Sequence, residues 1–182
     1  MGAVSNRITS TRGQYSLEEI VFLFGVAGVG KNWVAERLRD RMGYYFYDAD
    51  IDLTPVMRAA ITAKEHFTDS MRDEFFALIA RRIAELRKIH PKLVVAQAAY
   101  KQRNRDYLSR AVPGLKFIWV RAPNELIIER LGRRGDWISP EYAAQIYRNF
   151  EPPKLPCLVI ENDGGEARVL DQLQRLLEGE PR

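Results

Sequence analysis

The stretch Ile20–Leu38, "IVFLFGVAGVGKNWVAERL", decides the fold of this chain. Its first five residues, Ile20–Phe24, form a continuous apolar run of the length and residue types of a buried strand. A turn rich in glycine follows, and from Lys31 to Met42 apolar and charged residues recur at helical spacing until Gly43. The stretch therefore predicts a buried strand, a tight turn and a helix, in that order.

The turn between this strand and this helix carries the pattern of a phosphate-binding P-loop. "GVAGVGK", Gly25–Lys31, has two glycines separated by four residues and then a lysine. Backbone N–H groups of such a loop surround phosphate oxygens, and the lysine adds a positive charge. The alternative is an ordinary glycine turn, but the flanking strand and helix both stand in register with the motif and favour nucleotide binding. The residues predicted to bind nucleotide are Gly25, Val26, Ala27, Gly28, Val29, Gly30, Lys31, Asn32 and Trp33.

Asn32 stands where this motif normally has a hydroxyl that helps to hold Mg²⁺. An amide oxygen can also bind Mg²⁺, but it lies one atom further out on a bulkier group, and Mg²⁺ demands near-ideal octahedral geometry. We expect nucleotide binding to survive the change, and the metal to be held loosely or through water.

Beyond Gly43, short apolar runs alternate with longer amphipathic ones. The expected later strands are residues 45–47, 93–96, 117–120 and 157–160, and the expected later helices are residues 53–63, 69–89, 103–112, 124–133 and 165–177. Strands separated by helices imply parallel pairing. The prediction is an α/β, three-layer domain over residues 17–182, with a parallel sheet of about five strands flanked by helices. Residues 1–16 are expected to form a flexible tail, and residues 133–156 a lid insertion.

Composition narrows the class of protein. The 182 residues are 46% hydrophobic, enough for one domain with a core, and the formal charge of +4 suits anionic ligands without establishing nucleic-acid binding. Cys157 is the single cysteine, which excludes an intramolecular disulfide and favours a cytoplasmic setting. Because no apolar run reaches membrane-spanning length, no membrane association is expected.

Five segments complete a recognisable pattern. In chain order they are the P-loop, "FYDADIDLTP" (46–55), "DSMRDEFF" (69–76), "QAAYKQRNRDYLSR" (97–110) and "ERLGRRGDWISPEYAAQIYRNFEPP" (129–153). In this order they resemble the small P-loop kinases of metabolites, and among them the gluconate kinases, over about residues 20–177; shikimate kinases are close cousins. The chain departs from the gluconate kinase pattern at Asn32, at Thr54 in place of a His, and at Gln97-Ala98 in place of Cys-Ser.

The resemblance and the chemistry of the side chains together suggest roles. Asp50, just past a strand at the carboxyl edge of the sheet, could take a proton from a substrate hydroxyl as that oxygen attacks the γ-phosphate. Asp48, with Asn32, could hold Mg²⁺ through water. The alternative is that "DADID" is a polar loop with a helix cap.

Cationic side chains supply the remaining candidates. Arg72, Lys101 and Arg105 are candidates for binding the substrate beside Asp50, although each could equally be an exposed helix residue. Arg134, then Arg130, are the candidates for stabilising charge on the transferring phosphoryl group when the lid closes. The alternative for these two is a solvated, basic helix end.

The leading hypothesis is an ATP- and Mg²⁺-dependent kinase acting on a hydroxyl of a small, anionic metabolite, with gluconate or a related sugar acid first. Lys31, Asp50, Arg134 and Arg130 would be its catalytic residues. A nucleotide-binding regulatory module with weak or no turnover is the alternative that Asn32 motivates. A nucleotide or nucleic-acid-end kinase ranks last, because no distinctive aromatic and basic binding motif is present. The resemblance also implies a homodimer.

Overall fold

The structure is a computed structural model that describes residues 19–134, 147–154, 156–163 and 165–178. The tail predicted at residues 1–16 lies outside the described residues, and so does most of the lid predicted at 133–156.

A single five-stranded parallel sheet forms the centre of the described part. Its strands are β1 (Glu19–Phe24), β2 (Tyr45–Asp48), β3 (Lys92–Ala96), β4 (Leu115–Arg121) and β5 (Leu158–Glu161), in the order β2-β3-β1-β4-β5. The order places β1 in the middle, where its apolar run is covered on both faces. The continuous hydrophobicity of that run is therefore a consequence of its central position.

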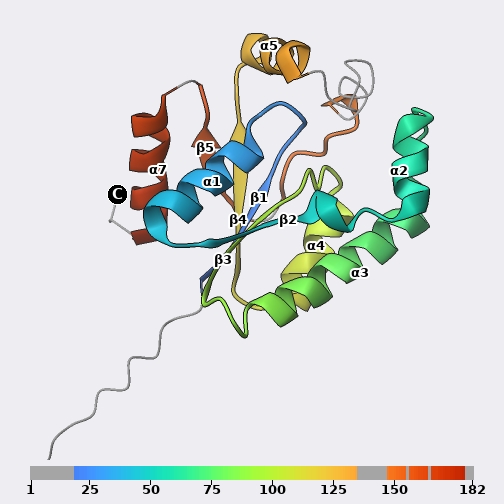
Figure 1. Cartoon of the computed structure of the whole chain (residues 1–182), viewed down its shortest axis with the longest axis horizontal. Helices are drawn as coiled ribbons and strands as arrows, with labels where there is room; N and C mark the ends of the chain where they lie inside the picture. Colours follow the sequence, from blue (N-terminus) through green and yellow to red (C-terminus); the bar gives the residue numbers. More distant parts are fainter. Residues whose placement is uncertain (1–18, 135–146, 155, 164, 179–182) are drawn as a thin grey trace, which may run out of the picture.

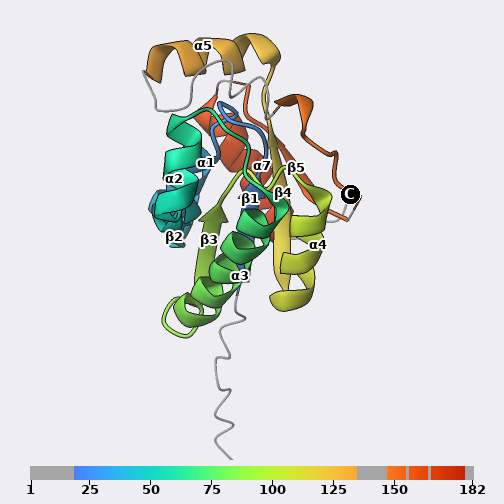
Figure 2. The ribbon, with the colours of Figure 1, turned by 90° about the vertical axis from the view of Figure 1, so that its right-hand side faces the viewer.

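Helices cover both faces of the sheet (Figures 1 and 2). On one face lie α1 (Lys31–Met42) and α7 (Glu166–Glu178), and on the other lie α3 (Asp69–Leu86) and α4 (Gln102–Ala111). The helix α2 (Pro55–Thr62) and the short 3₁₀ helix η1 (Ala49–Asp52) connect β2 to α3. Figure 1 shows α5 (Asn124–Arg134) in gold, lying across the end of the sheet that carries the P-loop.

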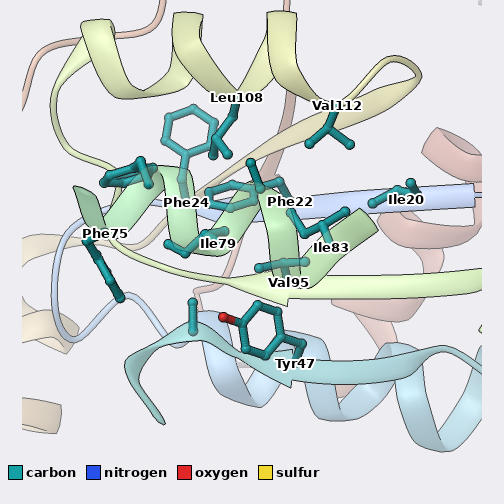
Figure 3. Close-up of a cluster of buried hydrophobic side chains, with 14 of the residues drawn as sticks. Ile20, Phe22, Phe24, Tyr47, Phe75, Ile79, Ile83, Val95, Leu108 and Val112 are labelled. Atoms are coloured by element: carbon teal, nitrogen blue, oxygen red, sulfur yellow. The ribbon is translucent and has the colours of Figure 1, made fainter. Parts of the chain in front are cut away.

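Alternation along β1 divides the core into two layers. Ile20, Phe22 and Phe24 face α3 and α4, whereas Val21 and Leu23 face α1 and α7. Figure 3 shows the first layer, in which Ile79 and Ile83 from α3, Leu108 from α4 and Val112 directly after α4 pack on these β1 side chains. This packing fixes the sheet between its helices. The loops that carry the site follow the carboxyl ends of its strands.

The expected strands and helices are present within a few residues of their predicted ends. The main difference is η1, which was not predicted. It forms because the Asp50 N–H donates to Asp48 Oδ1 at 3.0 Å, which tightens the chain immediately after β2. Thr54 then caps α2 by accepting the Met57 N–H at 3.2 Å, so the helix predicted from residue 53 begins at Pro55.

Strand register brings the carboxyl ends of three strands level. Asp48 at the end of β2 pairs with Ala96 of β3, and Ala96 pairs with Leu23 of β1. Residues that follow these strands therefore meet at one edge, where ligands bind in open α/β sheets. No helix of the described part combines the length and the apolar character needed to cross a membrane.

Candidate active site

The P-loop has the backbone geometry that its glycines predict. Gly30 has φ +88° and caps the N-terminus of α1. A Cβ atom on Gly30 would lie 2.3 Å from Asn162 Nδ2, and one on Gly28, at φ +84°, would lie 2.9 Å from Ile127 Cγ2. Both the left-handed conformation and the close neighbours require glycine. The loop thus brings its own amides close to the N–H groups of the first turn of α1, as an anion site needs.

Lys31 lies against this loop. Its Nζ donates to the carbonyl oxygens of Gly25 and Val26, each at 3.1 Å. These bonds hold the ammonium group beside the loop amides, where the outer phosphates of a nucleotide would be bound.

Two side chains, one from α5 and one directly after β5, hold the loop through hydrogen bonds. Arg130 on α5 donates to Val29 O at 3.3 Å and to Asn162 O at 3.2 Å. Asn162, which follows β5 and is 3% exposed, donates its Nδ2 to the same Val29 O at 2.8 Å. The predicted catalytic Arg130 therefore lies at the P-loop. The side chain of Arg134, the last residue of α5, lies outside the described part of the structure.

The two acids at the end of β2 each receive an amide donor. Asn32 Nδ2 donates to Asp48 Oδ2 at 2.7 Å, and Gln97 Nε2 donates to Asp50 Oδ1 at 2.9 Å. Asn32 thus points toward the acid with which it was predicted to share a metal. Trp33, the next residue, places its ring 5.0 Å from the Arg37 guanidinium.

Asp50 is electrostatically unlike an ordinary surface acid. Burial raises its pKa, and the neighbouring charge of Asp48 raises it further; the charges of Lys31 and Arg58 and the hydrogen bond from Gln97 act in the opposite direction. A carboxylate with a raised pKa is a better proton acceptor than a solvated one while it remains ionised. Asp50 has the environment that a general base requires.

Arg72 and Lys101 both lie beside one aromatic ring, that of Tyr100. Arg72 Nε donates to Tyr100 Oη at 3.0 Å, and its guanidinium lies 5.4 Å from the ring centroid. Lys101 Nζ lies 5.9 Å from the same centroid and pairs with Glu151 Oε1 at 3.1 Å. The structure therefore brings these two predicted substrate residues together, and two cations around one ring suit an anionic ligand.

Arg105 requires a correction. The sequence predicts a substrate contact, but its side chain is 1% exposed and its guanidinium lies 5.0 Å from the Phe24 ring and 5.7 Å from the Phe150 ring. It donates to Ala99 O at 2.6 Å, to Gln102 Oε1 at 2.7 Å and to Glu151 O at 2.6 Å. Because its two terminal nitrogens donate to protein groups inside the core, we expect Arg105 to be a structural residue.

The donor set at Asp48 fits Mg²⁺. Among the described residues no three His, Cys, Asp or Glu side chains cluster as a metal site. Magnesium in nucleotide sites needs only one or two protein ligands, with phosphate and water completing its octahedron. The Asp48 carboxylate and the Asn32 amide offer oxygen atoms of the kind that this ion prefers, so the residues present are compatible with it.

Three residues of the site were given no role by the sequence: Gln97, Tyr100 and Asn162. Gln97 directly follows β3, Tyr100 lies in the same loop, and Asn162 directly follows β5. Their signal was a polar residue at the carboxyl end of a buried strand. That signal could have found Gln97 and Asn162, but it could not have shown which acid or carbonyl group each of them contacts.

Comparison with known proteins places this geometry in a family. The AAA domain family matches residues 21–148, from β1 to beyond α5. The chain belongs to this family of AAA domains. Among curated relatives, it is 33% identical over 114 residues to a shikimate kinase of Microcystis aeruginosa, covering 61% of this chain and 56% of that one. It is 29% identical over 160 residues to a probable gluconokinase of Rattus norvegicus, covering 75% of this chain and 84% of that one. The chain thus spans little more than half the length of the shikimate kinase it matches.

Solved structures share the fold of this AAA domain. A sugar kinase from Janibacter sp. HTCC2649 superposes with a TM-score of 0.78 at 22% identity, covering 88% of this chain and 94% of that one. A gluconokinase from Sinorhizobium meliloti 1021 gives 0.74 at 24% identity, covering 90% and 95%. The solved structures confirm the three-layer fold, and the curated relatives confirm the resemblance to gluconate and shikimate kinases.

Proposed function

We propose that this chain is an ATP-dependent kinase that phosphorylates a hydroxyl group of a small, anionic metabolite. The observation that carries the proposal is Asp50: a half-buried acid with a raised pKa, influenced by the charge of Lys31 in the P-loop. A nucleotide-binding loop alone indicates only that phosphate is bound. An acid of this kind beside it supplies the group that an acceptor hydroxyl needs.

The residues divide the reaction among them. The P-loop amides and Lys31 bind the nucleotide phosphates, and Asp50 accepts the proton of the attacking hydroxyl. Arg130, and Arg134 at the end of the same helix, stabilise the charge that develops on the transferring phosphoryl group. Asp48 and Asn32 are the residues that would hold Mg²⁺, which when bound neutralises charge on the phosphates.

Two charged side chains indicate the class of acceptor. Arg72 and Lys101, both beside the Tyr100 ring, favour a carboxylate or another anionic group. The relatives are a gluconokinase and a shikimate kinase by name. Gluconate and related sugar acids are the first acceptors to test. We further propose that the chain is cytoplasmic and forms a homodimer. Light scattering on the purified chain would check the dimer.

The bond from Asn32 to Asp48 favours a second function, a nucleotide-binding regulatory module without efficient turnover. At 2.7 Å, this bond engages the acid that would hold the metal. If the bond persists when nucleotide binds, the metal loses a ligand and phosphoryl transfer slows, while nucleotide binding is retained.

Release of ADP distinguishes the two functions. The purified chain is incubated with ATP and Mg²⁺ against sugar acids, polyols, shikimate and nucleosides, and ATP binding is measured by calorimetry. Turnover that depends on one acceptor and disappears in Lys31→Ala supports the kinase. Tight ATP binding without turnover on any acceptor supports the module, and no ATP binding contradicts both.

A further inference from the structure

Gln97 makes two hydrogen bonds that fix which way its carboxamide faces. Its Oε1 accepts the Ala99 N–H at 2.8 Å, and its Nε2 donates to Asp50 Oδ1 at 2.9 Å. A backbone N–H can only donate, so the amide oxygen must face Ala99 and the NH₂ group must face the acid. Its own N–H donates to Leu23 O at 3.1 Å, which continues the β1–β3 pairing. The fold therefore determines that the NH₂ group of Gln97, and not its oxygen, faces Asp50.

The loop that anchors Gln97 is itself tightly held. Ala99 is 2% exposed and has φ +39°, a left-handed conformation that alanine rarely adopts. Its carbonyl accepts a 2.6 Å hydrogen bond from the buried guanidinium of Arg105. A strained residue persists only where its surroundings over-determine it, so the anchor of Gln97 is rigid.

Asp50 is consequently held at two points. Its backbone N–H donates to Asp48 Oδ1 at 3.0 Å, and its own Oδ1 accepts from Gln97. With Oδ1 engaged, Oδ2 is the oxygen that remains to accept a proton. The charged groups that act on Asp50 come from β2 (Asp48), α1 (Lys31) and α2 (Arg58). Gln97 adds a neutral donor that stabilises the ionised form against burial.

We propose that Gln97 is a positioning residue, which orients the Asp50 carboxylate so that Oδ2 receives the proton of the acceptor hydroxyl. The inference rests on the proposed kinase function for its role in turnover. The orientation itself is a property of the protein, so it can be tested whether or not an acceptor is found.

Two variants separate the effect of the hydrogen bond from Gln97 to Asp50 from the effect of the hydrogen bond between Gln97 and Ala99. Gln97→Met keeps the length and the burial of the side chain but removes both hydrogen bonds. Gln97→Glu keeps an oxygen for the Ala99 N–H, yet places an acceptor of like charge against Asp50. Gln172→Met is the matched control, because the Gln172 carboxamide on α7 also both donates and accepts. It donates to Glu161 O at 3.1 Å and to Arg168 O at 3.2 Å, and it accepts the Glu161 N–H at 2.9 Å.

The first measurement is a crystal structure of the wild type and of each variant, in which the orientation of the Asp50 carboxylate is compared. Without the donor from Gln97 the carboxylate is no longer held through Oδ1, and a negative charge at residue 97 repels it. The carboxylate is expected to rotate away from its wild-type orientation in Gln97→Met and in Gln97→Glu, and to keep that orientation in Gln172→Met. An unchanged orientation in either Gln97 variant overturns the proposal.

The second measurement is the pH profile of kcat/KM with the acceptor found in the ADP assay. In both Gln97 variants the acid limb is expected to move to higher pH, with kcat at neutral pH lower by about 10- to 100-fold and the affinity for ATP unchanged. If kcat falls without movement of the acid limb, Gln97 only fills space, and the proposal is wrong. If the wild-type chain turns over no acceptor, the kinase function fails, and the crystal structures alone decide whether Gln97 orients Asp50.

Discussion

Replacing Arg105 by methionine tests whether this arginine is structural or binds substrate. Methionine retains most of the aliphatic stem between Phe24 and Phe150 but donates no hydrogen bond. If Arg105 is structural, the free energy of unfolding falls sharply, and the affinity for ATP is retained under conditions where the variant is folded. If it binds the acceptor, KM rises and stability hardly changes.

The magnitude follows from the groups that lose a partner. Ala99 O and Glu151 O lose their donor, which costs about 1–3 kcal/mol each. Gln102 Oε1 still accepts the Lys154 N–H at 3.0 Å, so it adds little. Removing a buried cation relieves its desolvation, the same effect by which burial lowers the pKa of Arg105, and this offsets about 1 kcal/mol. The net loss is about 3 kcal/mol, or a Tm lower by about 6–12 °C.

Urea unfolding followed by circular dichroism measures this loss. Arg103→Met is the control, because Arg103 lies on the same helix, is 48% exposed and pairs with Asp69 and Asp73 at the surface. Its unfolding free energy should change by no more than about 0.5 kcal/mol. A loss below about 1 kcal/mol for Arg105→Met, or one equal to that of Arg103→Met, would refute the structural role.

Three further predictions concern the P-loop and its acids. Gly30→Ala adds a Cβ 2.3 Å from Asn162 Nδ2 in a left-handed conformation, so calorimetry should show ATP binding weaker by about tenfold or more. Gly43→Ala is the control, because Gly43 has φ +74° but no atom within 4 Å of its Cβ, and ATP affinity should not change. Equal effects of the two substitutions on ATP affinity would contradict the reasoning. Asp50→Asn should lower kcat by about 10²- to 10⁴-fold and raise Tm at neutral pH. Burial and Asp48 raise the pKa of Asp50 in the folded protein above its unfolded value, so the ionised acid costs stability as pH rises through the folded pKa. The gain in Tm of Asp50→Asn should therefore fade in acid. A Tm of Asp50→Asn below that of wild type at every pH would contradict this prediction. Asn32→Ser should keep ATP affinity and raise turnover at limiting Mg²⁺, since serine is too short to keep the 2.7 Å bond to Asp48, and unchanged turnover would show that Asn32 is no handicap.

Much of the fold was predictable because its signals are local. The apolar run of β1, the glycines of the P-loop and the spacing of α1 each depend on residues close in sequence, and α1 begins and ends at the predicted residues. The η1 turn was missed because one hydrogen bond, from Asp50 N to Asp48 Oδ1, redirects the chain. Such side-chain bonds compete with helix and strand without any periodic signal.

The sequence alone determined that a strand, a phosphate-binding loop and a helix follow one another, and that acids follow the second strand. Only the tertiary structure decided that Gln97 reaches Asp50, that Asn162 and Arg130 brace Val29, and that Arg105 is buried. Each of these contacts joins residues from different strands or helices, and the strand order β2-β3-β1-β4-β5 determines which loops meet. A long, charged side chain can face solvent or the core from the same helical position, and the choice depends on which carbonyls the packed layers leave without a donor.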